Sequence, residues 1–197
     1  TVLEPADLTA CRVIFGEADQ FPGLTVDRFS NILVTQTLSV GMEKLKPILF
    51  PLLVQVLRAD GQTIEGIYER NDEALRAKEG LAQNKGWFTL PGETHPDSTQ
   101  TEICENGVFY HVDFENGQKT GFFLDQKYNR LAMQRICKGK KVLDCFTHMG
   151  TFALSALTAC QHTFSVLRSG GRSRKYPGFS CTDFISASSC FLFMPVH

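Results

Sequence analysis

The chain has 197 residues, of which 43% are hydrophobic and 21% are charged, and its formal net charge at pH 7 is −1. These proportions are typical of a globular protein with room for one large domain or two small ones. The charge lacks the basic excess that is typical of nucleic-acid-binding proteins, although a local basic face is still allowed. The longest apolar stretch, residues 48–57, is too short to span a bilayer.

The seven cysteines are odd in number and irregularly spaced. The sequence contains no Cys-x-x-Cys pair and no Cys/His cluster with zinc-ligand spacing, so it predicts no metal site. The chain does not open with the charged and then apolar segment of a secretion signal. We therefore expect reduced cysteines in a cytoplasmic protein with no membrane partner.

The first part of the chain has the pattern of a mixed α/β module. Strands are expected over residues 11–15, 24–29 and 31–39, where β-branched and apolar residues are frequent. Asn106-Gly107 separates two further β-rich runs, and these two residues tolerate the positive φ angles of a tight hairpin turn.

Residues 42–59 carry apolar side chains at three- and four-residue steps, which predicts a helix. Pro47 and Pro51 count against a straight helix, and we expect one of them in its first turn, where the missing amide is harmless. A short strand over 64–69 and a short helix over 72–78 should follow.

A strand-turn-helix unit is predicted further along, with a strand over residues 141–146, a turn over 147–150 and a helix over 151–159. This is the opening of a doubly wound nucleotide-binding fold. Asp144 at the strand end and a glycine turn suit a ligand with amine, carboxylate and ribose groups, because the turn admits close backbone approach and the helix start offers free amides. The unit alone is weak support for a cofactor site, because such units are common.

A helix is expected before this unit, over residues 126–137, with a buried stripe of Leu131, Met133, Ile136 and Cys137.

Four segments occur in a characteristic order. They are Phe15–Arg28, Ile67-Tyr-Glu-Arg-Asn-Asp72, Gly117-Gln-Lys-Thr-Gly-Phe-Phe-Leu-Asp-Gln126 and Val142–Phe152. Together they resemble the class I S-adenosylmethionine-dependent methyltransferases that form 5-methylcytosine in large-subunit ribosomal RNA. The resemblance runs over residues 9–157.

The resemblance implies an order of domains. In the family a PUA domain comes first, followed by a mixed α/β central domain and a Rossmann-like catalytic domain. Residues 1–8 then correspond to a linker remnant, 9–115 to the central domain and 116–157 to the start of the methyltransferase domain. The expected fold class is therefore α/β, an α+β central domain followed by the first strand-turn-helix of a truncated Rossmann-like fold.

The resemblance also implies a cofactor, S-adenosylmethionine, and a partner, ribosomal RNA. The residues that match the segment over the cofactor are Phe123, Leu124, Asp125 and Gln126. Those that match the first cofactor-binding motif are Asp144, Phe146, Thr147, His148 and Gly150. Met149 replaces the threonine usually found in that motif, which would remove a polar contact without changing the turn.

Each matched residue has a purely structural alternative. Phe122 and Phe123 would then belong to the core, and Asp125 would cap the following helix. Lys119 and Arg130 would be solvated surface charges. His148 would be a packed turn residue.

The family pattern ends at residue 157. A complete domain would continue with a second strand ending in Asp or Glu, an Asp-Pro-Pro-like loop and a nucleophilic cysteine, and the sequence offers none of them. Residues 158–197 are expected to be a non-family tail, disordered or poorly packed, produced by a shifted reading frame or by divergence. The only basic cluster lies in this tail, so we do not interpret it as an RNA-binding patch. No cysteine is assigned as the nucleophile.

The sequence therefore predicts a fragment of an RNA methyltransferase that lacks activity itself. A non-catalytic module that binds RNA or protein is the first alternative. A fragment without function, and a methyltransferase acting on DNA or on a small molecule, also remain open.

Overall fold

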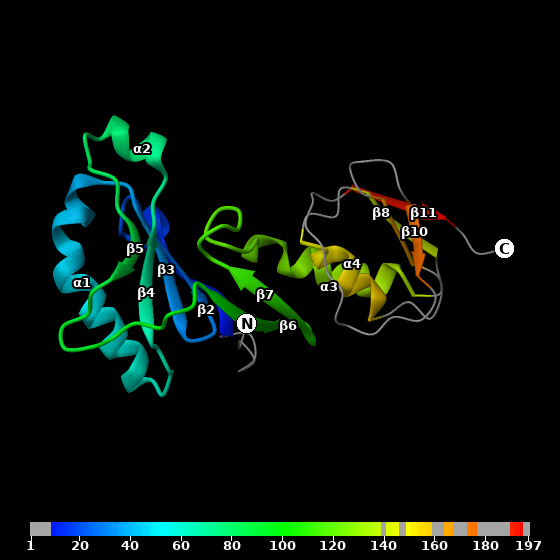
Figure 1. Cartoon of the computed structure of the whole chain (residues 1–197), viewed down its shortest axis with the longest axis horizontal. Helices are drawn as coiled ribbons and strands as arrows, with labels where there is room; N and C mark the ends of the chain where they lie inside the picture. The colour runs from blue at the N-terminus through cyan, green and yellow to red at the C-terminus, as the bar shows by residue number, and fades with distance from the viewer. Residues whose placement is uncertain are drawn as a thin grey trace. The chain divides into compact units, whose positions relative to one another are not determined.

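The computed structural model in Figure 1 describes residues 9–138, 141–145, 149–158, 164–167, 173–176 and 190–194. The chain divides into two units. The first unit comprises residues 1–105 and 109–124, and the second comprises 106–108 and 125–197. None of the helices in the described part of the chain combines the length and the apolar character that crossing a membrane requires.

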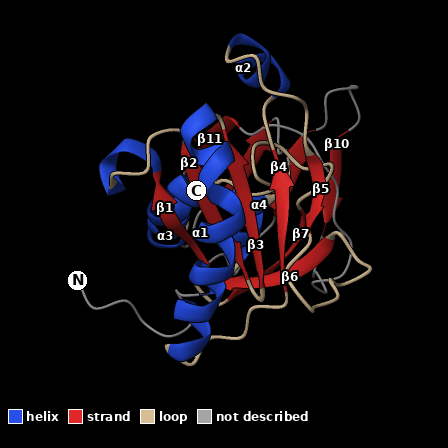
Figure 2. Ribbon diagram, turned by 90° about the vertical axis from the view of Figure 1, so that its left-hand side faces the viewer, coloured by secondary structure: helices blue, strands red, loops and turns tan. Residues whose placement is uncertain are grey.

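The first unit is built on a five-stranded sheet in the order β1-β2-β3-β4-β5, seen as neighbouring arrows in Figure 2. Only β3 and β4 run parallel; the other neighbours are antiparallel. The strands are β1 (Ala10–Phe15), β2 (Leu24–Phe29), β3 (Ile32–Thr37), β4 (Gly66–Arg70) and β5 (Lys85–Phe88), with a short 3-10 helix η2 (Gly16–Asp19) after β1. The strands expected over 11–15, 24–29 and 31–39 are confirmed, whereas β5 was not predicted.

Helix α1 (Val40–Ala59) connects β3 to the parallel strand β4 and lies along one face of the sheet (Figures 1 and 2). It begins at Ser39, whose side chain accepts a hydrogen bond from the amide of Met42 at 3.3 Å. Phe50 and Val54 are buried against the apolar side chains of the sheet, so the three- and four-residue spacing is that of a core-facing helix.

The expectation that a proline occupies the first turn of this helix is wrong. Both Pro47 and Pro51 lie inside α1, well beyond the first turn. Apolar contacts on the inner face hold the helix together despite the missing amide hydrogen bonds.

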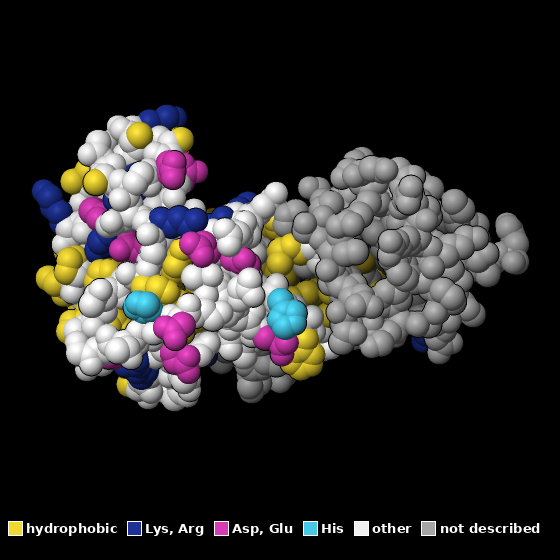
Figure 3. Space-filling model, viewed as in Figure 1, with side chains coloured by type: hydrophobic (Ala, Val, Ile, Leu, Met, Phe, Trp, Pro, Cys, Tyr) yellow, Lys and Arg dark blue, Asp and Glu magenta, His cyan; other side chains and the backbone are white. Residues whose placement is uncertain are grey.

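The outer face of α1 is also apolar. Figure 3 shows hydrophobic side chains along the edge of the molecule where α1 runs in Figure 1. Four large aliphatic side chains at helical spacing, which we name the outer stripe, are about half exposed or more: Leu45, Ile48, Leu52 and Val56.

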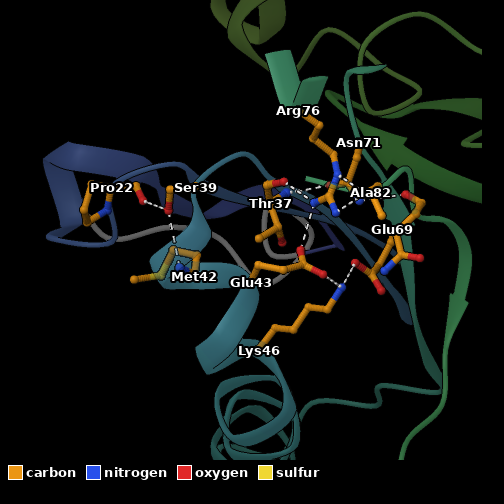
Figure 4. A network of polar contacts seen from close by, with 11 residues as sticks. Pro22, Thr37, Ser39, Met42, Glu43, Lys46, Glu69, Asn71, Arg76 and Ala82 are labelled. Atoms are coloured by element: carbon orange, nitrogen blue, oxygen red, sulfur yellow. Dashed lines mark hydrogen bonds and ion pairs between the residues drawn. The ribbon is translucent and has the colours of Figure 1, made fainter. Parts of the chain in front are cut away.

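A group of buried charges joins α1 to the carboxyl ends of β3 and β4 (Figure 4). Lys46 donates to Glu69 at 2.8 Å and pairs with Glu43 at 2.7 Å. The guanidinium of Arg76, which is 1% exposed, donates to Glu43 at 2.8 Å and to the carbonyl of Thr37 at 2.7 Å. Arg76 belongs to α2 (Glu73–Lys78), so this network holds α2 against the sheet.

The predicted short helix and the predicted hairpin are both confirmed. Asp72 caps α2 by accepting a hydrogen bond from the amide of Leu75 at 3.0 Å. Strands β6 (Gln100–Glu105) and β7 (Val108–Asp113) pair in a two-stranded sheet. Asn106 and Gly107 between them have φ angles of 52° and 78°, as the tight turn requires.

In its described residues, the second unit has the α-helices α3 and α4 and a four-stranded sheet in the order β10-β9-β8-β11. The 3-10 helix η3 (Leu124–Gln126) leads into α3 (Lys127–Ile136), which packs on α4 (Thr151–Leu157). The strands are β8 (Lys141–Cys145), β9 (Phe164–Leu167), β10 (Ser173–Tyr176) and β11 (Cys190–Met194).

The predicted buried stripe of α3 is partly wrong. Met133 and Cys137 are buried in a small core with Val142, and Leu131 is half-buried. Ile136 is 45% exposed and does not belong to this core.

The described part of residues 158–197, which the sequence assigned to a disordered or poorly packed tail, includes the strands β9, β10 and β11. Strand β9 runs parallel to β8, with Asp144 opposite Val166, so a second parallel strand follows the predicted strand-turn-helix. Strands β10 and β11 pair antiparallel with β9 and β8 respectively. Poor packing of this stretch stays a prediction, as do the domain limits at 115 and 157.

Candidate functional site

The turn between β8 and α4 carries two of the predicted cofactor residues. Asp144 lies one residue before the end of β8 and is 0% exposed. Gly150 stands immediately before α4, is buried, and has a φ of 72°. A side chain at this position would be strained, so the local backbone requires glycine. Phe146, Thr147 and His148 lie outside the described residues.

These two residues lie in a strand-turn-helix unit of the kind that binds ligands in open α/β sheets. A carboxylate at the carboxyl end of a parallel strand lies where open α/β sheets bind their ligands. The left-handed glycine turns the chain directly into α4, and no side chain caps that helix. Among the described residues, no group of three His, Cys, Asp or Glu side chains is arranged to hold a metal ion.

The second set of predicted residues spans the boundary between the two units. Phe123 and Leu124 close the first unit, and both are half-buried. The ammonium of Lys119 lies 4.9 Å from the centroid of the Phe123 ring, so Lys119 is not simply a solvated charge. Phe122 is 2% exposed and packs on Tyr110, which confirms the core alternative for this residue.

Asp125 and Gln126 open the second unit. Asp125 is exposed and accepts a hydrogen bond from the Gln126 side chain at 3.2 Å. The residue that caps α3 is Gln126, without a side-chain cap bond, so the capping alternative for Asp125 is wrong. Asn129 donates to the Gln126 side-chain oxygen at 2.8 Å and orients that amide.

Arg130 is not a surface charge. Its side chain is 0% exposed, and its guanidinium carbon lies 6.0 Å from the centroid of the Phe152 ring. Arg130, Met133 and Cys137 are spaced by three and four residues and therefore share one face of α3. This spacing in the sequence indicated that position 130 is buried.

The segment Gly117–Gly121, which we name the signature loop, makes contacts that the sequence did not reveal. The hydroxyl of Thr120 donates to the Asp27 carboxylate at 2.6 Å. Arg12 donates to the same carboxylate from Nε at 2.7 Å and from Nη2 at 3.0 Å. Arg70 donates to the carbonyl of Gly117, and burial lowers the pKa of Arg70.

Two glycines make the signature loop possible. A Cβ on Gly117 would collide with the carbonyl oxygen of Asp113 and lie 2.9 Å from that of Gly121. Gly121 has a φ of 124°, and a Cβ there would lie 3.0 Å from the Cα of Phe114. The loop is therefore fitted closely to the end of β7.

Part of the chain is similar to a known protein family. Residues 86–172 match the family model described as S-adenosylmethionine-dependent methyltransferase. The matched stretch contains both sets of predicted cofactor residues.

Two of the curated relatives that the chain matches carry the same protein name. The chain is 40% identical, over 168 residues, to ribosomal RNA large subunit methyltransferase I of Pseudoalteromonas translucida (strain TAC 125), covering 84% of this chain and 40% of the relative. It is 41% identical, over 160 residues, to the protein of the same name from Yersinia pestis bv. Antiqua (strain Angola), covering 81% of this chain and 38% of the relative. The chain thus spans about two fifths of the length of these relatives.

Solved structures share the fold. A putative SAM-dependent methyltransferase from Streptococcus mutans superposes with a TM-score of 0.61 at 24% identity, covering 80% of this chain and 38% of that protein. The putative methyltransferase SMU.776, complexed with SAH, gives the same TM-score and identity and is covered to 37%. These likenesses support the Rossmann-like α/β class predicted from the sequence.

Proposed function

We propose that the chain is part of an enzyme that forms 5-methylcytosine in large-subunit ribosomal RNA with S-adenosylmethionine as the methyl donor. The observation that carries the proposal is the turn from β8 to α4, with buried Asp144 and left-handed Gly150, inside the stretch that matches the family model. The names of the curated relatives support ribosomal RNA as the partner.

Several features of the proposal follow from the family resemblance. In the family a PUA domain comes first, and residues 1–8 would correspond to the linker that follows it. Residues 9–115 would form the central domain and 116–157 the start of the catalytic domain, with 158–197 outside the family pattern. The enzyme would act in the cytoplasm.

When bound, S-adenosylmethionine supplies an electrophilic methyl group. Asp144 and Gly150 would hold its polar groups at the β8 turn, together with Phe146, Thr147 and His148. The segment of Phe123, Leu124, Asp125 and Gln126 would cover it and exclude water.

The chain by itself should not transfer a methyl group. Methylation at the C5 carbon of cytosine needs a thiolate that adds to the ring beside the flipped base. Cys137 is buried in the apolar core of the second unit, and Cys11 and Cys104 are half-buried in the first unit. None of these three described thiols lies in the part of the chain that matches the cofactor motif.

The test measures methyl transfer and cofactor binding separately. The purified chain is incubated with labelled S-adenosylmethionine and large-subunit ribosomal RNA, and we expect no labelled RNA. Calorimetric titration with S-adenosylhomocysteine should detect weak binding that Asp144→Asn reduces at least about tenfold and the exposed control Asp60→Asn does not. Labelled 5-methylcytosine would refute the inactivity, and equal affinity of Asp144→Asn and the unchanged chain would refute the cofactor site.

The alternative is a non-catalytic binding module, and the outer stripe of α1 is the observation that favours it. Contiguous exposed aliphatic side chains are typical of protein-binding surfaces. RNA affinity that falls steeply with salt would instead indicate phosphate contacts.

A further inference from the structure

Three of the four sequence segments that carry the family resemblance meet at the signature loop. Asp27 comes from the first segment and accepts the hydrogen bond of Thr120. Arg70 comes from the second segment and donates to the carbonyl of Gly117. Thr120 and Gly117 both belong to the third segment. Thr120 is 93 residues away from Asp27 in the sequence. The first unit therefore supplies an anchor for the segment that leads to Phe123.

Asp27 is a rigid anchor. It lies within β2, which is paired with β1 on one side and β3 on the other, so its backbone is held from both directions. Its side chain is 0% exposed and receives one hydrogen bond from Thr120 and two from Arg12. A buried carboxylate is tolerated only with such partners, and hydrogen bonds to a charged group are the strong ones.

The signature loop connects the anchored Thr120 to Phe123 through a tight turn. The amide of Gly121 donates to the carbonyl of Gln118 at 2.8 Å, which closes a tight turn around Lys119 and Thr120. Lys119 has a left-handed φ of 52°, and its ammonium lies over the ring of Phe123. Since the backbone of Gly117 and Gly121 lies close against the end of β7, we expect that fixing Thr120 also fixes the direction in which the chain continues to Phe123.

We propose that Asp27 is a positioning residue, which acts through Thr120 to fix the orientation of Phe123 in the segment that is proposed to cover the cofactor. This inference rests on the proposed function for the cofactor role of that segment. The anchoring itself is a property of the first unit and can be measured without any cofactor.

The experiment compares three variants of the full chain. Thr120→Val removes the hydroxyl that bonds Asp27 and keeps the shape, whereas Thr120→Ser keeps the hydroxyl. Thr35→Val is the matched control, because Thr35 is 0% exposed and its hydroxyl has no hydrogen-bond partner among the described residues. For each variant we measure amide hydrogen exchange over residues 117–124, the urea midpoint and the dissociation constant for S-adenosylhomocysteine.

We expect Thr120→Val to speed exchange in the signature loop by about tenfold or more and to weaken S-adenosylhomocysteine binding, because a buried hydrogen bond to a charged group is lost. Thr120→Ser should restore both quantities, and Thr35→Val should change neither. Unchanged loop exchange in Thr120→Val would overturn the proposal. Faster exchange with unaltered affinity would also overturn it, because Asp27 would then be only structural.

The proposed function can fail separately. If the unchanged chain binds no S-adenosylhomocysteine, the proposed cofactor site fails for this chain. The exchange rates, with rescue by Thr120→Ser, then decide whether Asp27 holds the segment.

Discussion

Gly117 is the position at which a single methyl group should disturb the first unit most. Gly117→Ala would push a Cβ against the backbone oxygens of Asp113 and Gly121. We expect the free energy of unfolding to fall by about 1–3 kcal/mol, as for other overpacked sites. Urea denaturation followed by the fluorescence of the single tryptophan, Trp87, measures the change.

Gly41→Ala is the matched control for this substitution. Gly41 lies in α1, and a Cβ there meets no atom within 4 Å. Alanine favours the helix, so the control should be more stable by about 0.5–1 kcal/mol. Equal stability of the two variants would show that the signature loop is looser than described.

Glu43 should make stability depend on pH. Its burial alone would raise its pKa, but hydrogen bonds from Arg76 and Lys46 outweigh this effect, and the pKa lies below its ordinary value of 4.5. A lowered folded-state pKa means that the stabilisation is present above the ordinary pKa and is lost as pH falls through the folded value. Glu43→Gln should therefore reduce the loss of stability that occurs as the pH falls below 4.5.

Thermal unfolding at a series of pH values checks this dependence. Glu65→Gln serves as the control, because Glu65 is exposed. The idea fails if both variants lose stability with acid as steeply as the unchanged chain does.

The site could be predicted at the residue scale only where the motif is local. Asp144 and Gly150 follow from a strand, a turn and a helix that are contiguous in sequence. Asp27 was missed because the contact that gives it a role joins residues 93 positions apart, and spacing along the chain says nothing about such a pair. Arg130 was misjudged because its charge suggested exposure, although its position on α3 indicated burial.

At the scale of elements, the prolines of α1 should be destabilising. Pro47 is exposed and lies inside the helix, where it removes one backbone hydrogen bond and crowds the preceding turn. Pro47→Ala should raise the free energy of unfolding by about 1–3 kcal/mol, which denaturant titration would measure.

Pro91→Ala is the contrasting variant. Pro91 is exposed and lies outside the helices and strands, where proline restricts the unfolded chain. Its replacement should lower stability or leave it unchanged. A loss of stability in Pro47→Ala would mean that α1 depends on the bend that proline imposes.

Elements were predictable where the local pattern and the tertiary contacts agree. Strands β1 to β3 and the Asn106-Gly107 hairpin follow from apolar runs and turn residues. Strand β5 was missed because it has four residues, one of them Gly86, and owes its state to pairing with β4. The prediction for α1 placed the helix correctly, but sequence spacing could not tell which apolar stripe faces the sheet.

At the scale of the whole molecule, we predict that trypsin cuts first within residues 158–197. This stretch follows the end of the family pattern and contains Arg168, Arg172, Arg174 and Lys175. Mass spectrometry of an early digest should therefore show a fragment that retains the first unit. Arg76 is buried, so early cleavage after it would instead indicate that trypsin reaches the first unit as readily as it reaches residues 158–197.

The hairpin turn has a consequence for how such a protein can be divided. Residues 106–108 group with residues 125–197, while the strands on either side of them belong to the first unit. Asn106 donates to the carbonyl of Lys127 at 3.1 Å and accepts a hydrogen bond from Gln134 at 3.2 Å. No single break in the gene therefore yields two self-sufficient pieces. A chimera that exchanges everything after residue 124 would have to bring a matching hairpin tip with it.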